Sequence, residues 1–220
     1  MSSTASPVSP SAVIAFWNEA GPQKWFSKDD DFDRRFRDTF LITHEAAARG
    51  ELDGWLDAPD SALALVLLLD QFPRNSFRGT PRMFATDALA RAKTELAIER
   101  GHDHAVDERV RFFFYLPFSH SEELADQERA VALGEHLGPE LSKHTRGHRD
   151  IVQRFGRFPH RNAVLGRPSS EAELATLRNS IDTMPEIKSA LEAKGLTSAN
   201  VIAANMTQDG ALTLVTKKAS

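Results

Sequence analysis

Apolar side chains recur at helical spacing over most of the 220 residues, and this periodicity constrains the fold more than any other feature. Phe32, Phe36 and Phe40 follow one another at four-residue steps, which places the three rings on one face of a helix over residues 29–48. The run ALALVLLL at 62–69 is apolar on every side and therefore predicts a helix that is buried all round. Because no strand-like alternation occurs before residue 200, we expect an all-α fold.

Capping and helix-breaking residues divide the chain into further helices. Proline in a first turn, a small polar residue before it and glycine after the last turn are the signals. They predict a helix from Pro10 to a stop at Gly21-Pro22, a helix capped by Asp60-Ser61 and a helix from Thr80-Pro81 to Gly101. Another helix is predicted to begin with a capping box of Ser170 and Glu173. Further helices are predicted over residues 106–115, 119–137, 140–155 and 185–194.

The periodicity weakens near the C-terminus. Residues 201–217 are typical either of a β-hairpin that turns at Asp209-Gly210 or of a loose tail. We expect one domain of stacked antiparallel helix hairpins at 8–184, followed by a C-terminal extension of uncertain structure at 185–220.

Charge and composition exclude several classes of protein. The net charge of −4 argues against a surface devoted to nucleic acid or to an acidic membrane. The absence of cysteine removes disulfides, zinc–thiolate sites and thiol nucleophiles. The first residues lack the pattern of a secretory signal, and the apolar run at 63–69 is too short to span a bilayer. We expect a soluble cytoplasmic protein that binds neither membrane nor nucleic acid.

Three segments carry unusual polar chemistry, at residues 70–79, 115–127 and 148–167. Asp70 ends a buried helix, so its carboxylate must face a partner. Asp87, Gln127 and His148 fall on apolar helix faces, where polar groups need hydrogen bonds. Residues 154–167 hold four arginines, one histidine and no acid, and arginine is suited to bidentate binding of carboxylate or phosphate.

These segments predict an Arg/His-lined pocket for a small anionic metabolite, a phosphate or a carboxylate. Imidazole titrates near neutral pH, so acid–base catalysis is expected from His120, His148 and His160, with Glu122 or Asp70 orienting the ring. Ligand-binding roles are expected for a larger polar set: Asp70, Gln71, Arg74, Asn75, Arg78, Asp87, Gln127, Arg157, Arg161, Asn162 and Arg167. The predicted activity is that of a hydrolase or transferase that needs no cofactor. For any single residue of this set, an ordinary Arg–Asp ion pair that joins two helices explains its presence as well.

Other chemistries are less well supported. The His120-x-Glu122 step and the pair His144 and His148 have spacings that suit a metal, but neighbouring arginines repel cations, so no metal is predicted. A serine triad through Ser119 lacks the strand and elbow that usually carry the nucleophile. RNA binding by residues 154–167 is disfavoured by the net charge. A helical scaffold that binds a peptide or protein partner remains the alternative to an enzyme.

Long motifs in the three segments resemble a known family. They are LDQFPRN at 69–75 with FRGT at 77–80, YLPF at 115–118 with HSE at 120–122, and RFGRFPHRN at 154–162 with LGR at 165–167. Together with Trp17, Trp25 and Phe32 they resemble the bacterial "domain of unknown function 924" family over about residues 13–180. The resemblance implies an all-helical, tetratricopeptide-like fold and no established activity.

Overall fold

The computed structural model describes residues 6–206 and 212–217, which form two compact units, 1–156 and 157–220. About 73% of the chain is helical, which confirms the predicted all-α fold. In the first unit the elements are α1 (Pro10–Trp25), α2 (Asp30–Ala48), η1 (Asp53–Asp57), α3 (Pro59–Ser76), η2 (Pro81–Phe84), α4 (Asp87–Glu99), η3 (His102–Ala105), α5 (Glu108–Arg111), η4 (Phe112–Phe114), α6 (Leu116–Ser119), α7 (Leu124–Gly134), η5 (Glu135–Leu137) and α8 (Pro139–Phe155), where η marks a 3-10 turn. In the second unit they are η6 (Pro159–Arg161), α9 (Glu171–Asp182), α10 (Pro185–Glu192), η7 (Ser198–Asn200), β1 (Val201–Met206) and β2 (Leu212–Thr216).

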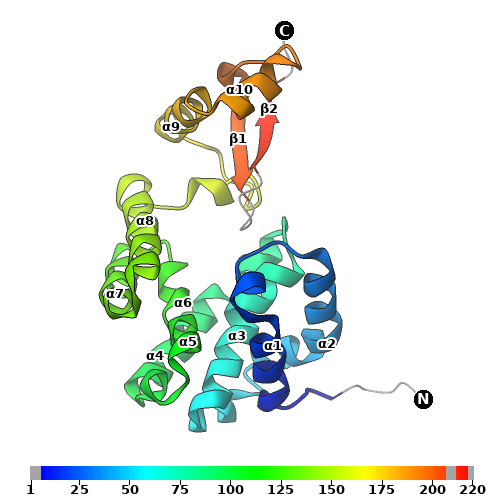
Figure 1. Ribbon diagram of the computed structural model, residues 1–220, viewed down its shortest axis with the longest axis vertical. Helices are drawn as coiled ribbons and strands as arrows, with labels where there is room; N and C mark the ends of the chain where they lie inside the picture. The colour runs from blue at the N-terminus through cyan, green and yellow to red at the C-terminus, as the bar shows by residue number, and fades with distance from the viewer. Residues whose placement is uncertain (1–5, 207–211, 218–220) are drawn as a thin grey trace, which may run out of the picture. The chain divides into compact units, whose positions relative to one another are not determined.

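Helix α3 forms the centre of the first unit. It packs against α1, α2 and α4, which lie beside it in Figure 1, and its residues from Ala62 to Ser76 are buried. The three phenylalanines of α2 face this core as the four-residue spacing predicts, and Phe36 packs edge-on against Phe72 of α3. The prediction of a helix buried all round is therefore confirmed.

Prolines lie inside two helices, and in α3 a side chain satisfies the carbonyl group that the proline leaves without a donor. Pro73 lies within α3 and has no N–H for the carbonyl of Leu69, which instead accepts a 2.5 Å hydrogen bond from Oγ1 of Thr86. At the other break, Gly21 has a φ of 67° and Pro22 follows it, yet α1 resumes and runs to Trp25. The predicted stop at Gly21-Pro22 is thus a kink rather than an end.

Several predicted boundaries are wrong. Ala58, not Asp60-Ser61, precedes α3, and no side chain caps that helix. The hydroxyl of Thr80 donates to the carbonyl of Phe77 instead of capping, and the predicted helix after it is divided into η2 and α4. Pro117 lies in the first turn of α6, so the phenylalanine run before it is split into short turns instead of forming one helix at 106–115. The helix predicted at 119–137 is confined to α7, with η5 after it.

The second unit has its own small apolar core. Ile181 of α9, Leu191 of α10 and Val201 of β1 are buried together. The predicted capping box at the start of α9 is present, with the Ser170 and Glu173 side chains each bonded to the other's backbone N–H. Strands β1 and β2 pair antiparallel, with Ala204 opposite Leu214. This confirms the hairpin, while its predicted turn at Asp209-Gly210 lies outside the described residues. The domain boundary after residue 184 stays a prediction.

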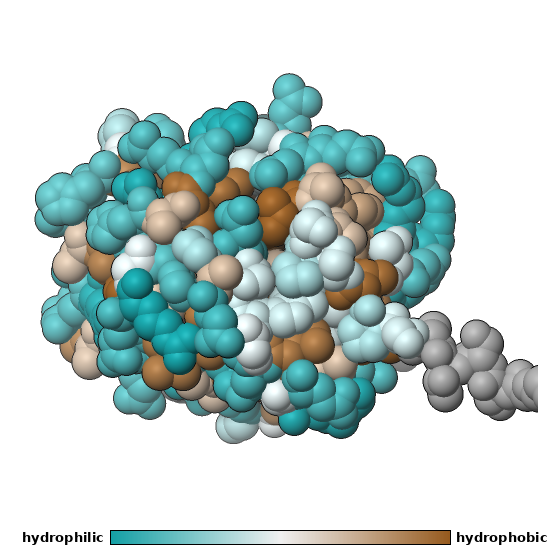
Figure 2. Space-filling view, turned by 90° about the horizontal axis from the view of Figure 1, so that it is seen from below, coloured by the Kyte–Doolittle hydropathy of each residue, from teal (hydrophilic) through white to brown (hydrophobic). Residues whose placement is uncertain are grey.

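Figure 2 shows a face on which hydrophilic side chains predominate and hydrophobic residues appear in small groups between them. No helix among the described residues is long and apolar enough to cross a bilayer.

Candidate functional site

A buried carboxylate–imidazole pair lies where α3 meets the end of α6. Asp70 is completely buried and His120 is 8% exposed. The Nδ1 atom of His120 lies 2.8 Å from Oδ1 of Asp70, and Oδ2 of Asp70 accepts a hydrogen bond of 2.7 Å from Gln71. A carboxylate can only accept at this distance, so Nδ1 carries the proton and Nε2 carries the lone pair.

Arg74 connects this pair to a second carboxylate. Its guanidinium donates two hydrogen bonds to Asp87, of 2.8 and 3.0 Å, and Nη1 lies 3.0 Å from Oδ1 of Asp70. The side chains of Arg74 and Asp70 are 3% and 1% exposed, and that of Asp87 is 11% exposed. One guanidinium therefore compensates two carboxylates, so Arg74 is held by protein acids instead of being presented to a ligand.

The electrostatics of the cluster favour a neutral imidazole beside an ionised carboxyl group. Burial raises the pKa of Asp70, but the positive charge of Arg74 together with the charge of His120 when it is protonated and the hydrogen bonds from His120 and Gln71 outweighs burial and holds that pKa at about 2. Burial lowers the pKa of His120, and the charge of Arg74 lowers it further, against the opposing pull of Asp70. His120 is thus a desolvated, oriented imidazole with its basic nitrogen on the side away from Asp70.

Two further histidines of α8 lie near His120. The ring centres of His120 and His148 are 6.3 Å apart, and those of His148 and His144 are 4.2 Å apart. Nδ1 of His148 lies 3.0 Å from the carbonyl oxygen and 2.9 Å from the hydroxyl of Ser119. Because the carbonyl can only accept, Nδ1 of His148 bears the hydrogen. It therefore does not serve as the base that a Ser119 nucleophile needs, and Ser119 itself is fully buried.

Gln127 has a structural position. It is fully buried, as its place on the inner face of α7 predicts, and Nε2 donates to the carbonyls of Ser119 and Ser121 at 2.8 and 2.6 Å. These carbonyls lie at and just beyond the end of α6, where a helix leaves acceptors without internal partners. Gln127 thereby fixes the chain that carries His120. Its contacts also explain why α7 begins only after that segment.

Polar residues at the end of α3 and just after it are tied to α2. Arg78 donates to Oδ2 of Asp33 at 2.6 Å and to Oδ1 at 3.2 Å, and Asn75 donates to Oδ1 of Asp33 at 2.7 Å. Sequence reasoning missed this role of Asp33, because an acid in a first helical turn was fully explained by the helix dipole. The spacing held a signal, since Asp33 is three residues before the buried Phe36.

His44 was also missed. It is 4% exposed on α2, its Nδ1 lies 2.9 Å from the carbonyl oxygen of Leu68, and its ring stacks on Phe72 with centres 4.7 Å apart. Burial lowers its pKa. The signal in the sequence was the four-residue stripe on α2, which continues from Phe40 to His44.

In the second unit, Glu173 organises much of the predicted arginine segment. Its carboxylate accepts two hydrogen bonds from Arg157, of 2.7 and 2.8 Å, and a longer one from Asn162. The hydrogen bonds from Arg157, with smaller contributions from Ser170 and Asn162, lower the pKa of Glu173 to about 2 against the opposing effect of burial. Arg167 donates to the side-chain oxygen of Asn162 and to the carbonyl of Phe158. Many side chains of this segment therefore form hydrogen bonds that hold together the loop before α9.

The remaining predicted residues occupy both units. In the second unit Arg161 stacks on Phe158, with Cζ 4.5 Å from the ring centre, and His160 contacts the same ring. In the first unit Glu122 is half-buried before α7. The structure thus brings Asp70, Gln71, Arg74, Asp87, His120, Gln127 and His148 into one neighbourhood, and Arg157, Arg161, Asn162, Arg167 and His160 into another. A single pocket formed by all of them stays a prediction.

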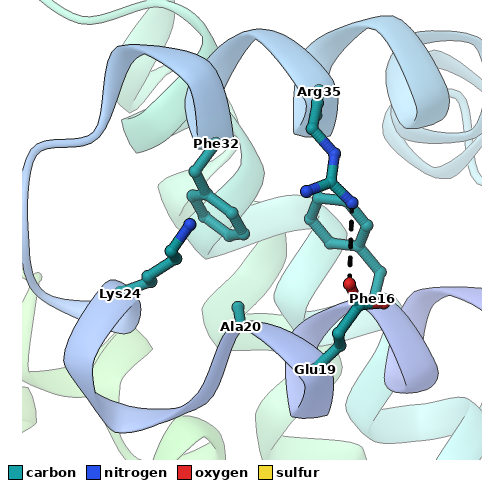
Figure 3. A pocket seen from close by; sticks show the side chains of 6 residues that line it. All are labelled: Phe16, Glu19, Ala20, Lys24, Phe32 and Arg35. Carbon is teal, nitrogen blue, oxygen red and sulfur yellow. Dashed lines mark ion pairs between the residues drawn. The ribbon is translucent and has the colours of Figure 1, made fainter.

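The hollows described in the first unit lie elsewhere. One is a recess of about 50 Å³ between α1 and α2, where an ion pair of 3.7 Å joins Arg35 to Glu19 beside Phe16 and Phe32 (Figure 3). It is large enough for little more than water. None of the predicted site residues lines it. Among the described residues no three His, Asp or Glu side chains are arranged to hold a metal ion.

Comparison with known proteins places the chain in a family. The family model described as "Bacterial protein of unknown function (DUF924)" matches residues 13–180. The chain belongs to this family. Among solved structures, a protein of unknown function, ATU0120 from Agrobacterium tumefaciens, is 56% identical with a TM-score of 0.76. The match covers 77% of this chain and 97% of that one. No curated protein matches the chain.

The DUF924 region contains every predicted site residue. It ends inside α9, so α10 and the β-hairpin lie beyond it. The buried cluster of Asp70, Arg74, Asp87 and His120 therefore lies within the part of the chain that matches the family.

Proposed function

We propose that this DUF924 protein is an enzyme, a hydrolase or a transferase, in which His120 acts as the general base. The observation that carries the proposal is the 2.8 Å contact between Nδ1 of His120 and the ionised, fully buried Asp70. A carboxylate in this position fixes the tautomer and ring orientation and stabilises the imidazolium that forms when Nε2 takes a proton. Arg74 holds Asp70 in place and keeps it ionised, and Asp87 orients Arg74.

The substrate we propose is a small anion, a phosphate or a carboxylate. Arg74 and Arg78 are engaged by acids of the protein, so they are better explained as structural ties. The proposed anion-binding residues are Arg161, whose guanidinium plane is fixed on Phe158, and Arg167, which donates to the side chain of Asn162 and to the carbonyl of Phe158. Guanidinium groups held in this way are pre-organised for bidentate binding.

Thermal-shift measurements with inorganic phosphate, phosphomonoesters and carboxylic acids test anion binding. A ligand that binds the folded state raises the melting temperature of the wild type, and Arg161→Ala should lose that shift while staying folded. Binding that survives in Arg161→Ala would refute the role of Arg161. Absence of a shift with every anion would refute the substrate class.

Turnover of a bound compound tests the base. His120→Asn keeps a side-chain N–H at the position of Nδ1, so the bond to Asp70 is retained while the basic nitrogen is lost. We expect turnover to fall by about 100-fold or more with little change in binding. His136→Asn, at an exposed histidine of η5, is the matched control. Equal rates in both variants would contradict the proposal.

A scaffold for a peptide partner is the second candidate. It is supported by a mainly apolar groove of about 470 Å³ between the starts of α1 and α3, lined by Pro10, Ile14, Ala15 and Ala58. Ile14→Asp should abolish peptide binding at this groove and leave acid–base turnover unchanged, which separates the two candidates.

A further inference from the structure

Three imidazoles of the first unit lie at successive depths below the surface. His144 is exposed on α8, His148 one turn later is half-buried, and His120 is 8% exposed beside the fully buried Asp70. The ring centres are 4.2 Å apart in the first step and 6.3 Å apart in the second, and Nδ1 of His120 is 2.8 Å from Asp70. The series therefore runs without a large gap from solvent to the buried carboxylate.

A buried base that does not pass its proton to the leaving group needs a path by which that proton reaches solvent. If His120 takes a proton in each reaction, that proton must leave before the next one. Asp70 holds its negative charge strongly because its pKa is about 2, and the guanidinium of Arg74 does not release protons at neutral pH. The other acid in the cluster, Asp87, is bonded to Arg74 on both oxygens. Histidine is the side chain that exchanges protons readily near neutral pH.

We propose that His148 and His144 form a proton relay between His120 and solvent, an inference that rests on the proposed role of His120 as a base. The proton bound at Nε2 of His120 passes to Nε2 of His148, leaves from that same nitrogen to His144, and then passes to a buffer base, while Nδ1 of His148 keeps its hydrogen on the carbonyl of Ser119. Each imidazole gains one proton and loses one, so all three return to the neutral form. The 6.3 Å step is longer than a direct hydrogen bond between rings, so a water molecule completes it.

The surroundings suit the middle member. Nδ1 of His148 donates to the carbonyl of Ser119, which stabilises the imidazolium while His148 holds the extra proton. The adjacent charges on α8, Arg149 and Asp150, form an ion pair with each other.

The test is the rate at which Nε2 of His120 exchanges its proton with solvent, measured by nitrogen-15 relaxation NMR across a pH titration of the full chain. The variants are His144→Gln and His148→Asn, the second of which keeps an N–H donor for Ser119. His136→Gln is the control. We expect both relay variants to slow exchange by about 100-fold, the lower range of what a positioned proton-transferring group contributes. Imidazole added to the buffer should restore the rate in His144→Gln, and the control should exchange like the wild type.

The same spectra separate the two proposals. A neutral His120 with its hydrogen on Nδ1 supports the base, and any other protonation state refutes the base and the relay together. If the tautomer is as expected but exchange in both variants equals that of the wild type, the relay is refuted and the base is not. Slow exchange that added imidazole fails to restore also refutes the relay, because it shows that the histidines act only through packing.

Discussion

Replacing Arg74 by methionine should destabilise the first unit more than any surface change. Methionine fills a similar volume, so the main loss is charge: Asp70 and Asp87 stay buried without their guanidinium. Breaking a buried ion pair from one side typically costs about 3–5 kcal/mol, because an uncompensated charge is left behind. Arg34→Met removes the exposed partner of Asp31 and should cost less than about 1 kcal/mol.

Urea denaturation followed by tryptophan fluorescence measures this loss. All three tryptophans of the chain, Trp17, Trp25 and Trp55, are in the first unit, so the signal reports its unfolding. The difference in the free energy of unfolding between the wild type and Arg74→Met should also become smaller as the pH falls from 7 toward 4. In the wild type the pKa of Asp70 is lowered. The stabilisation of the folded protein by its ionised carboxylate is therefore present above pH 3.8, the pKa of an aspartate in the unfolded chain, and declines below that pH. In the variant burial raises the pKa of Asp70, so protonation relieves the strain.

Two results would refute this reasoning. A loss of less than about 1 kcal/mol at neutral pH would show that the carboxylates are solvated or that the cluster rearranges. A difference independent of pH would show that the loss comes from packing and not from the charge of Asp70.

Three further predictions concern the same unit. Burial lowers the pKa of His44 below its usual 6.5, so the free energy of unfolding should fall as the pH drops below that value. In urea titrations, the free energy of unfolding of His44→Asn should depend less steeply on pH than that of the wild type. An equally steep dependence in both proteins contradicts this prediction. Gly156→Ala should cost about 1 kcal/mol, since Gly156 ends α8 with a φ of 68°, whereas Gly147→Ala inside α8 should stabilise by a similar amount; melting curves that shift in the same direction for both would contradict the backbone argument. Gln127→Leu should cost about 1–3 kcal/mol by leaving buried carbonyls without a donor, and a chemical denaturation midpoint equal to that of the wild type would refute its capping role.

Helical periodicity predicted the fold because it reports which faces are buried. The stripe through Phe32, Phe36 and Phe40 and the apolar run in α3 required nothing beyond the 3.6-residue repeat. Boundaries between short turns could not be predicted in the same way. The division of residues 106–119 into α5, η4 and α6 depends on which carbonyls later side chains such as Gln127 satisfy, and local sequence does not contain that information.

The sequence predicted which residues belong to the candidate site better than it predicted which of them contact one another. A carboxylate at the end of a buried helix requires a partner, and Asp70 has three in Arg74, His120 and Gln71. That His120, fifty residues later, provides one of these contacts follows only from tertiary packing. The engagement of Arg78 by Asp33 was equally hidden, because an acid in a first helical turn already has a local explanation.

The core of the second unit determines where this chain can be cut. The family domain ends at residue 180, inside α9, but Leu177 and Ile181 of that helix pack against Leu191 and Val201 from the extension. A protein truncated at residue 180 would lack the residues that pack against the apolar side of α9, so that side would be exposed. Transplanting the domain between proteins therefore requires carrying residues 181–217 along or replacing the apolar surface of α9 with polar side chains.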